Sequence, residues 1–172
     1  MLENFKRFRS IRKYKNLPVD DELLNKVMSA ALISPSSRSN RPWEFIVVKD
    51  TEKLKDLSLS KASGSAFIKE APVAVVIIAD PARSDVWVED CSIAAYNIQV
   101  CARSYGLGTC WIQTRLRKTK EGSSSEDRVK DILGIPEKFS VECIITLGHP
   151  DEIKIPYTEK DMDFDKIHYD AY

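Results

Sequence analysis

The chain has 172 residues, the usual length of one domain, and a chain of this size buries roughly 70% of the surface that its unfolded form exposes. Its 26 basic and 26 acidic residues cancel, so it lacks the excess positive charge typical of proteins that bind nucleic acids or anionic membranes. The longest apolar run, Ala71 to Ala79, is too short to span a bilayer, and the polar, basic start of the chain lacks the form of a signal peptide. We therefore expect a single cytoplasmic domain over residues 1–172, with no nucleic-acid or membrane partner.

Apolar periodicity and turn signals predict helices and short strands in alternation. Acidic residues after Pro18 suit the positive end of a helix dipole, and Pro72 to Ala79 is apolar on both faces, as in a covered strand. Ser123 and Glu126 have the spacing of a capping box. In chain order, the expected elements are a short helix 4–10, a helix 18–31, a loop 34–42, a strand 45–48, a surface helix 51–59, a strand 72–79, a helix 87–105, a strand 108–112, a helix 123–133 and a strand 141–147. They predict an α+β fold whose central sheet has at least four strands and helices on both faces.

The segment from Trp87 to Tyr105 is the most informative of these elements. Apolar residues cover nearly its whole circumference, and its charges are confined to Glu89, Asp90 and Arg103. A helix that is apolar all round has to be buried all round, and one chain of this size can hardly supply that cover. We therefore expect an obligate dimer with this helix in or beside the interface. Gly106 is expected to end the helix as a C-cap residue.

Residues 148–172 are predicted to form an irregular tail. The tail contains two prolines, yet it is too apolar in places to remain a free coil. We expect it to wrap over its own subunit or a neighbouring one. Its large apolar residues are Ile153, Ile155, Tyr157, Phe164, Ile167, Tyr169 and Tyr172.

The cysteines and histidines do not indicate a metal site. Cys91, Cys101 and Cys143 lie in apolar surroundings, and no two of the four cysteines form a C-x-x-C pair. Cys110 has no histidine near it in the sequence that would mark it as a nucleophile. We expect free thiols that pack as small apolar groups, with disulfides or metal ligands as the less favoured alternative.

The basic segment near the N-terminus is the first candidate for a binding site. Arg9, Ser10 and Arg12 place two guanidinium groups and a hydroxyl within a short segment, and these donors can converge on a phosphate. The alternative is a solvated basic terminus, which spacing alone favours. The proline-stiffened loop from Ser34 to Pro42 offers further hydroxyl and backbone donors, although it can also be a plain connection.

Common nucleotide-binding and hydrolase motifs do not occur in this sequence. Gly106 and Gly108 form a G-x-G pair, but Trp111 stands where a dinucleotide fingerprint has its third glycine. The pair also follows a predicted helix, whereas the fingerprint follows a strand. There is no Walker motif and no G-x-S-x-G elbow. The sequence therefore predicts neither a Rossmann nucleotide site nor a hydrolase nucleophile.

The order of these segments resembles the nitroreductase family over nearly the full chain. No single motif is specific for this family, but seven motifs in the expected order and at family-like distances form a specific pattern. The matching segments are Arg9-Ser10-Ile11-Arg12, Ser34-Pro35-Ser36-Ser37, Arg41-Pro42-Trp43 with the strand to Val48, Ala71-Pro72-Val73, Glu89-Asp90 through Ala94 to Asn97, Gly106 to Trp111, and Leu147-Gly148-His149-Pro150.

The resemblance implies a mainly antiparallel sheet in an intertwined homodimer, with FMN at the interface and the tail 148–172 over the dimer. The implied activity transfers electrons from NAD(P)H through flavin N5 to a small nitroaromatic or quinone-like acceptor. The flavin performs the chemistry, so no catalytic acid or base is implied, and a cation such as Arg12 near N1 and the C2 carbonyl would favour the reduced flavin. The implied FMN-binding residues are Arg9, Ser10 and Arg12 at the phosphate and ribityl chain, Pro35, Ser36 and Ser37 from the other subunit, Trp111, Ile112 and Gln113 beside the ring, and Lys160 in the tail.

The sequence departs from the family pattern at several positions. Phe8 stands where a bulky polar or basic residue is common, Arg41 replaces the usual Gln, and Gly64 has no side chain to contact the ring. Because Phe8 cannot contribute a polar group, phosphate binding is expected to depend on Arg7 or on the tail, where Lys160 is the best candidate although it lacks the usual K-x-R form.

Three alternative functions stay open at this point. The resemblance also covers flavin-dependent dehalogenation, ring desaturation and flavin fragmentation. A second alternative is an FMN-binding protein that stores or senses flavin without turnover. The third is a structural dimer whose basic N-terminus is merely solvated.

Overall fold

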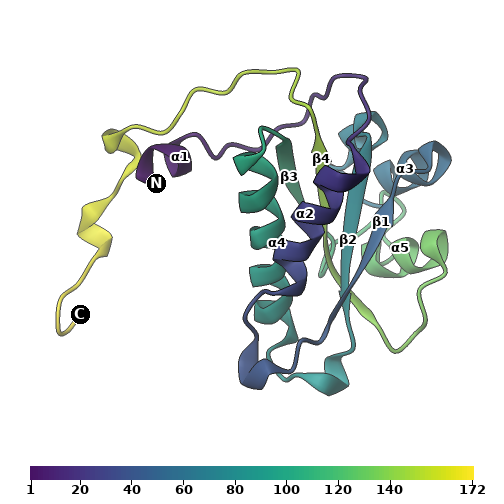
Figure 1. Cartoon of the computed structure of the whole chain (residues 1–172). Coiled ribbons are helices and arrows are strands. Elements are labelled where there is room, and N and C mark those ends of the chain that lie inside the picture. Colours follow the sequence, from purple (N-terminus) through teal and green to yellow (C-terminus); the bar gives the residue numbers. More distant parts are fainter.

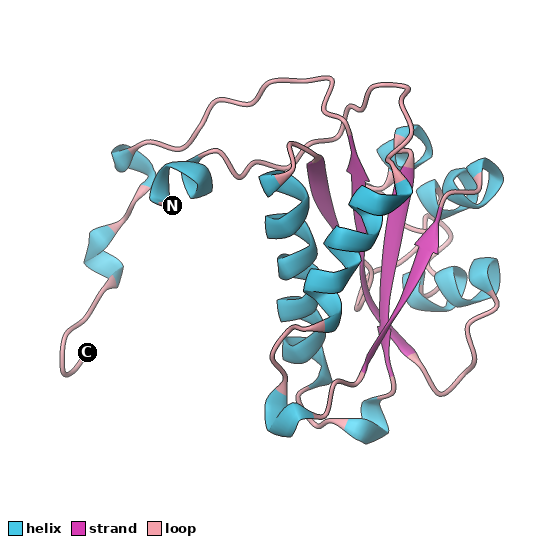
Figure 2. Ribbon diagram, viewed as in Figure 1, coloured by secondary structure: helices cyan, strands magenta, loops and turns pink.

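A four-stranded antiparallel sheet forms the centre of the molecule, and helices pack on both of its faces (Figures 1 and 2). The computed structural model describes all residues from 1 to 172. The strands are β1 (Trp43–Val48), β2 (Val73–Ala79), β3 (Gly108–Gln113) and β4 (Ser140–Gly148), in the spatial order β1-β2-β4-β3. The α-helices are α1 (Leu2–Lys6), α2 (Asp21–Leu32), α3 (Thr51–Ser58), α4 (Trp87–Ser104) and α5 (Ser125–Leu133), and the short 3-10 helices are η1 (Ser37–Ser39), η2 (Ala66–Glu70), η3 (Pro81–Arg83), η4 (Glu159–Asp161) and η5 (Phe164–Lys166). The predicted α+β class with a mainly antiparallel sheet is confirmed.

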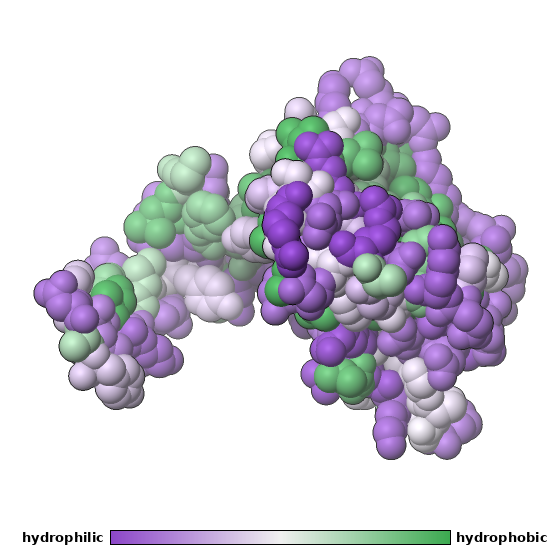
Figure 3. Space-filling model, turned by 90° about the horizontal axis from the view of Figure 1, so that it is seen from below, coloured by the Kyte–Doolittle hydropathy of each residue, from purple (hydrophilic) through white to green (hydrophobic).

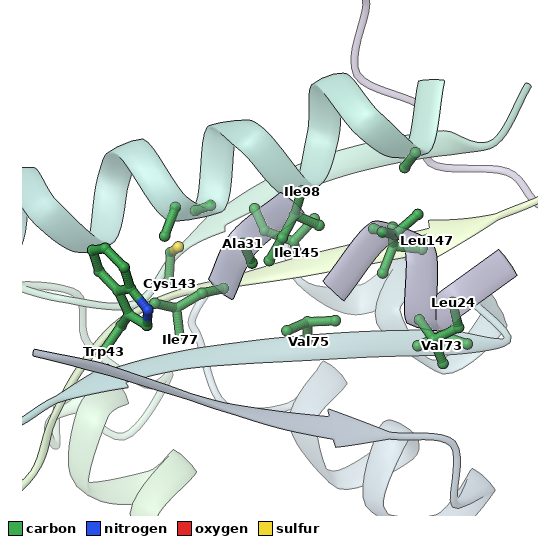
Figure 4. Packing of buried hydrophobic residues seen from close by; sticks show 14 of the residues in the cluster. Leu24, Ala31, Trp43, Val73, Val75, Ile77, Ile98, Cys143, Ile145 and Leu147 are labelled. Carbon is green, nitrogen blue, oxygen red and sulfur yellow. The ribbon is translucent and has the colours of Figure 1, made fainter. Parts of the chain in front are cut away.

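Strand β2 shows why the sheet is covered on both sides. All of its residues are buried. Val73, Val75 and Ile77 pack in the core that α2 and α4 close, where Ile98 and Ile145 also lie (Figure 4). The alternate residues of β2 face the second core, under α3 and α5. Each fully buried Val or Ile contributes roughly 1.5–3 kcal/mol, so this strand requires helices on both faces.

Helix α4 ends as the sequence predicts. Gly106 has a φ of +78°. The Leu107 N–H donates to the Ala102 carbonyl at 3.0 Å, and the Gly106 N–H donates to the Arg103 carbonyl at 2.9 Å. This is a Schellman ending, whose left-handed residue is free of steric cost when it is glycine. Neither α4 nor any other helix combines the length and the apolar composition needed to cross a membrane.

The start of α5 differs from the predicted capping box by one residue. Ser124, not Ser123, is the N-cap residue. The Ser123 hydroxyl instead pairs with that of Thr119 at 2.8 Å, and Glu126 accepts the N–H of Val141 at 3.1 Å. The predicted capping box is wrong, because Ser123 and Glu126 both form hydrogen bonds with other residues of the fold.

The two ends of the chain form a terminal arm, which we define as residues 1–8 together with 153–172. The arm projects from the body of the molecule and carries apolar residues on its surface (Figures 1 and 3). The Tyr157 N–H donates to the Lys6 carbonyl at 2.8 Å, which joins the two segments. The expected helix over 4–10 instead begins at Leu2 and ends at Lys6, and the chain beyond it runs extended toward β3. The tail extends away from the body of its own chain and does not wrap over it (Figure 1), and the alternative that it wraps over a neighbouring subunit stays a prediction.

Candidate functional site

The segment from Arg9 to Lys15 crosses the ends of β3 and β4. The Ile11 N–H donates to the Thr109 carbonyl at 2.9 Å, which attaches the segment to the outer side of β3. Gly108 permits this approach, because a Cβ atom at that position would lie 2.7 Å from Cγ2 of Ile11. Gly148 pairs with Gly108 across the two strands, and a Cβ there would lie 2.6 Å from Cδ of Pro72. The glycines of both motifs therefore make room for neighbouring chain segments.

Arg103, in the last turn of α4, holds the N-terminal segment in place. Its guanidinium group donates to Oγ1 of Thr109 at 3.2 Å, to the Arg7 carbonyl at 3.3 Å and to the Arg9 carbonyl. The guanidinium carbon also lies 5.0 Å from the centre of the Phe8 ring. Burial lowers the pKa of Arg103, in keeping with a cation that is partly withdrawn from water. One side chain thus joins α4, β3 and the basic segment.

We expect Arg103→Met to raise amide hydrogen exchange over residues 8–12 by roughly tenfold or more, since hydrogen bonds to a charged group contribute about 1.5–3 kcal/mol. Hydrogen–deuterium exchange read by mass spectrometry measures this change. Arg83→Met is the matched control, because Arg83 makes only one long contact, to the Asn40 carbonyl at 3.4 Å. Unchanged protection of residues 8–12 in Arg103→Met would contradict the role assigned to Arg103.

Ser10 and Arg12 lie beside Cys110 of β3. Burial raises the pKa of the Cys110 thiol, and Arg12 and Ser10 act in the opposite direction, which places both near the sulfur. Glu152 accepts the backbone N–H of Arg12 at 2.6 Å and so fixes the main chain there. The Arg12 guanidinium lies over the ring of Phe67, with 5.8 Å from its central carbon to the ring centre. This guanidinium has no hydrogen-bond or ion-pair partner in the chain.

Two further cations extend this positive region. The pKa of Lys61 is lowered, first by burial and then by the neighbouring charge of Arg117. Lys61, like Arg12, lies close enough to Cys110 for the charge on one group to affect the pKa of the other. We call Arg12, Lys61 and Arg117 the basic cluster, and none of its members forms an ion pair. Unpaired cations beside an exposed hydroxyl are a donor set that suits an anion.

Arg9 and Lys160 lie away from the basic cluster. The Arg9 guanidinium donates to the Ile155 carbonyl and lies 4.4 Å from the centre of the Tyr157 ring. Lys160 is exposed on η4, and its side chain makes no hydrogen bond or ion pair. Within one chain, the structure therefore brings Ser10 and Arg12 to β3 and leaves Arg9 and Lys160 with the terminal arm.

The loop that contains Pro35, Ser36 and Ser37 is held at the other end of α4. Asp90 is buried, and its carboxylate accepts the Ser37 N–H and the Ser84 hydroxyl, each at 2.8 Å. Asn97 donates to the hydroxyl of Ser34, also at 2.8 Å. Further along the loop, Arg38, Ser39 and Arg41 have φ values of 51°, 56° and 44°. Such left-handed residues cost free energy and persist only where neighbouring contacts enforce them, a feature that clusters at ligand sites.

Helix α4 separates the two candidate segments. Asp90, which holds the loop, and Arg103, which holds the basic segment, lie 13 residues apart, or ~20 Å along the axis at 1.5 Å per residue. In Figure 1, the loop after α2 lies at one end of α4, and the chain approaching β3 lies at the other. Ser10 and Ser37 of one chain therefore do not meet.

Strand β3 has one open edge, because only β4 pairs with it. The Thr109 carbonyl points away from β4, toward Ile11. Since the direction of main-chain groups alternates along a strand, the N–H groups of Trp111 and Gln113 point to the same open edge. Ile112 instead buries its side chain in the core under α3 and α5. Open N–H groups of an edge strand are available to a ligand or to another chain.

The sequence model of the Nitroreductase family matches residues 6–64 and 56–149. The chain belongs to the nitroreductase family. A protein of Archaeoglobus fulgidus assigned as NADH dehydrogenase/NAD(P)H nitroreductase is 36% identical over 169 residues, which is 95% of this chain and 94% of the relative. A Methanothermobacter thermautotrophicus protein with the same assignment is 38% identical over 178 residues, which is 100% of this chain and 87% of the relative.

Among solved structures, this nitroreductase resembles an FMN-dependent nitroreductase from Clostridium difficile R20291. The two chains are 47% identical, superpose with a TM-score of 0.98, and cover each other completely (100% of each chain). The agreement extends over the sheet, the helices and the terminal arm.

The sequence assigned no individual role to four residues that hold or extend the candidate site of this nitroreductase. Asp90 and Asn97 lie in the family-like motif from Glu89 to Asn97, and their spacing of two helical turns signals a shared face. Arg103 was noted only as a charge on an apolar helix, which is itself a signal that it has a specific partner. Lys61 gave no signal, because only the fold brings it to β3.

Proposed function

We propose that this nitroreductase binds FMN between two copies of the chain and passes electrons from NAD(P)H to a small nitroaromatic or quinone-like acceptor. The observation that carries the proposal is the unpaired basic cluster beside Ser10 and the open edge of β3. The names of the relatives from Archaeoglobus fulgidus, Methanothermobacter thermautotrophicus and Clostridium difficile support the nicotinamide donor and the flavin.

The residues present fit FMN by their chemistry. A flavin mononucleotide offers a phosphate, a chain of hydroxyls and a ring system that becomes negatively charged when reduced. Ser10 and Arg12 supply a hydroxyl and a free guanidinium group for the phosphate and the ribityl chain. Lys61 and Arg117 add positive charge that favours the reduced state of a nearby ring. The N–H groups of Trp111 and Gln113 are unpaired donors for the ring edge.

A second copy of the chain would complete this site. Ser10 and Ser37 lie toward opposite ends of α4, so a two-fold pair with antiparallel α4 helices would bring the loop of one chain to the basic segment of its partner. The outer face of α4 supports this arrangement, since Ile93 and Tyr96 on it are 41% and 46% exposed in the single chain. The exposed terminal arm has the apolar residues needed to cover the partner.

In this mechanism, the role of the polypeptide is to bind and orient FMN. When bound, FMN supplies the exchange of hydride and electrons, through N5 in this proposal. Ser10 and Arg12 hold the phosphate end, while the basic cluster stabilises negative charge. Asp90 and Arg103 fix the two segments that grip the cofactor. No side chain of this set has to transfer a proton.

The visible spectrum of the purified protein tests this function. We expect a yellow protein whose flavin absorbance is bleached anaerobically by NADH or NADPH and restored when a quinone or a nitroaromatic compound is added. Flavin that remains bound but that neither nicotinamide reduces would replace the proposed turnover with a storage or sensing role. A colourless protein that does not take up added FMN would overturn the proposal.

A further inference from the structure

A buried carboxylate lies next to β3 on the side that faces α4. Glu142 is only 3% exposed, and it lies at an irregularity of β4, where the pairing with β2 shifts between Ile77 and Ile78. Its backbone carbonyl accepts the N–H groups of Thr114 at 3.3 Å and Arg115 at 3.0 Å. The irregularity thus turns Glu142 toward the end of β3.

A chain of hydrogen bonds leads from Glu142 to the open edge of β3. The indole Nε1 of Trp111 donates to Oε1 of Gln113 at 2.9 Å, and Nε2 of Gln113 donates to Oε1 of Glu142 at 3.2 Å. An indole can only donate, so the Gln113 oxygen has to face Trp111, and the amide N–H groups then need acceptors. Those acceptors are the Glu142 carboxylate and the carbonyls of Glu142 and Arg115, both at 3.4 Å. The chemistry of each group therefore fixes the donor-to-acceptor direction of these hydrogen bonds, from Trp111 through Gln113 to Glu142.

The second carboxylate oxygen of Glu142 is an anomaly. Oε2 is the one buried side-chain oxygen or nitrogen without a hydrogen-bond partner. A carboxylate in such a place costs free energy in the folded protein, and a sequence selected for stability alone would replace it with an apolar residue. Glu142 therefore calls for a functional explanation.

We propose that Glu142 is a positioning residue that, through the amide of Gln113, fixes the indole of Trp111 and with it the open edge of β3 that meets the flavin. The inference rests on the proposed function for the position of the flavin along β3. The hydrogen-bond chain itself belongs to the protein and is testable without any cofactor.

The ionisation of Glu142 provides an independent readout. Burial raises its pKa above the ordinary value of 4.5, Gln113 and Arg115 act in the opposite direction, and Glu126 of α5 and Glu89 of α4 raise it slightly further. The thiols of Cys91 and Cys143 are the other titratable groups that interact with it, and burial keeps both protonated. Acidification through this raised pKa neutralises the carboxylate and weakens the acceptor offered to Gln113.

The experiment follows the indole N–H resonances of the three tryptophans by NMR, in the full chain with and without FMN, and Trp111→Phe assigns the relevant peak. In the wild type, we expect the Trp111 peak to titrate with an apparent pKa above 4.5. Glu142→Leu should move the peak upfield and make this N–H exchange roughly fivefold faster, which corresponds to one net hydrogen bond of about 1 kcal/mol. Glu142→Gln keeps an acceptor and should restore the peak position while abolishing its titration.

Binding of FMN separates this inference from the proposed function. With FMN bound, Glu142→Leu should shift the visible spectrum and the midpoint potential of the flavin, whereas Glu142→Gln and the control Glu44→Gln, an exposed carboxylate on β1, should leave them close to wild type. A Trp111 peak that ignores pH and both Glu142 variants would overturn the inference while leaving flavin binding intact. A wild-type chain that shows the titration but takes up no FMN would overturn the proposed function instead, and Glu142→Gln keeps the test open if Glu142→Leu does not fold.

Discussion

Arg12→Ala is expected to raise the dissociation constant of FMN by roughly ten- to a hundredfold, because a hydrogen bond to a charged group contributes about 1.5–3 kcal/mol. Arg12 is the member of the basic cluster whose main chain is fixed, through Glu152 and through the contacts of Ile11, while its guanidinium has no partner in the chain. Its side chain can thus bind a ligand without breaking any hydrogen bond or ion pair within the chain.

Quenching of flavin fluorescence on titration into the FMN-free protein measures this effect. Lys13→Ala is the matched control, because it removes the same charge from the adjacent exposed position. The loss in Arg12→Ala should shrink as the salt concentration rises, since screening weakens the interaction that the arginine supplies. Equal affinities of Arg12→Ala and Lys13→Ala would show that the phosphate is held elsewhere.

Ile93→Asp should separate the two copies of the chain and abolish flavin binding at the same time. Ile93 is exposed on the outer face of α4 in one chain, and in the proposed dimer this face is buried. A carboxylate placed there would be desolvated without a partner, which costs several kcal/mol and should raise the dimer dissociation constant at least a hundredfold. FMN would be lost because, in the proposed dimer, each site takes residues from both chains.

Light scattering coupled to size-exclusion chromatography measures the mass, and absorbance of the same peak measures the flavin. Leu59→Asp is the control, because Leu59 is 61% exposed and follows α3, on the opposite face of the sheet. A wild-type protein that is monomeric at micromolar concentration would remove the dimer from the proposal. A monomeric Ile93→Asp that still binds FMN tightly would show that one chain suffices.

The sequence was sufficient to predict the four strands and the four longer helices, because their signals are local. The run from Val73 to Ala79 required a strand covered on both faces, and Gly106 required the end of a helix. The capping box at Ser123 failed by one residue because Thr119 and Val141 provide competing partners, and no sequence pattern reveals such competition.

The sequence named some residues of the candidate site and not others, and the difference has a physical cause. Ser10 and Arg12 have suitable donor chemistry, but that chemistry alone favoured a solvated terminus, and only the resemblance to the nitroreductase family implied that they bind FMN. Arg103 could not be assigned, because it binds the carbonyl of a residue 94 positions away, and a carbonyl is present at every residue. Glu142 was missed because its burial depends on an irregularity in the pairing of two strands.

The length of α4 sets the separation between the two segments that it holds. Asp90 and Arg103 hold binding segments toward opposite ends of one rigid helix, so the number of residues between them sets both a distance and an angle. Insertion or deletion of one residue would shift one end by about 1.5 Å and rotate it by about 100°, which in the proposed dimer would misalign its segment with the segment from the other copy. The number of residues between Asp90 and Arg103 is therefore constrained separately from the identity of the side chains between them.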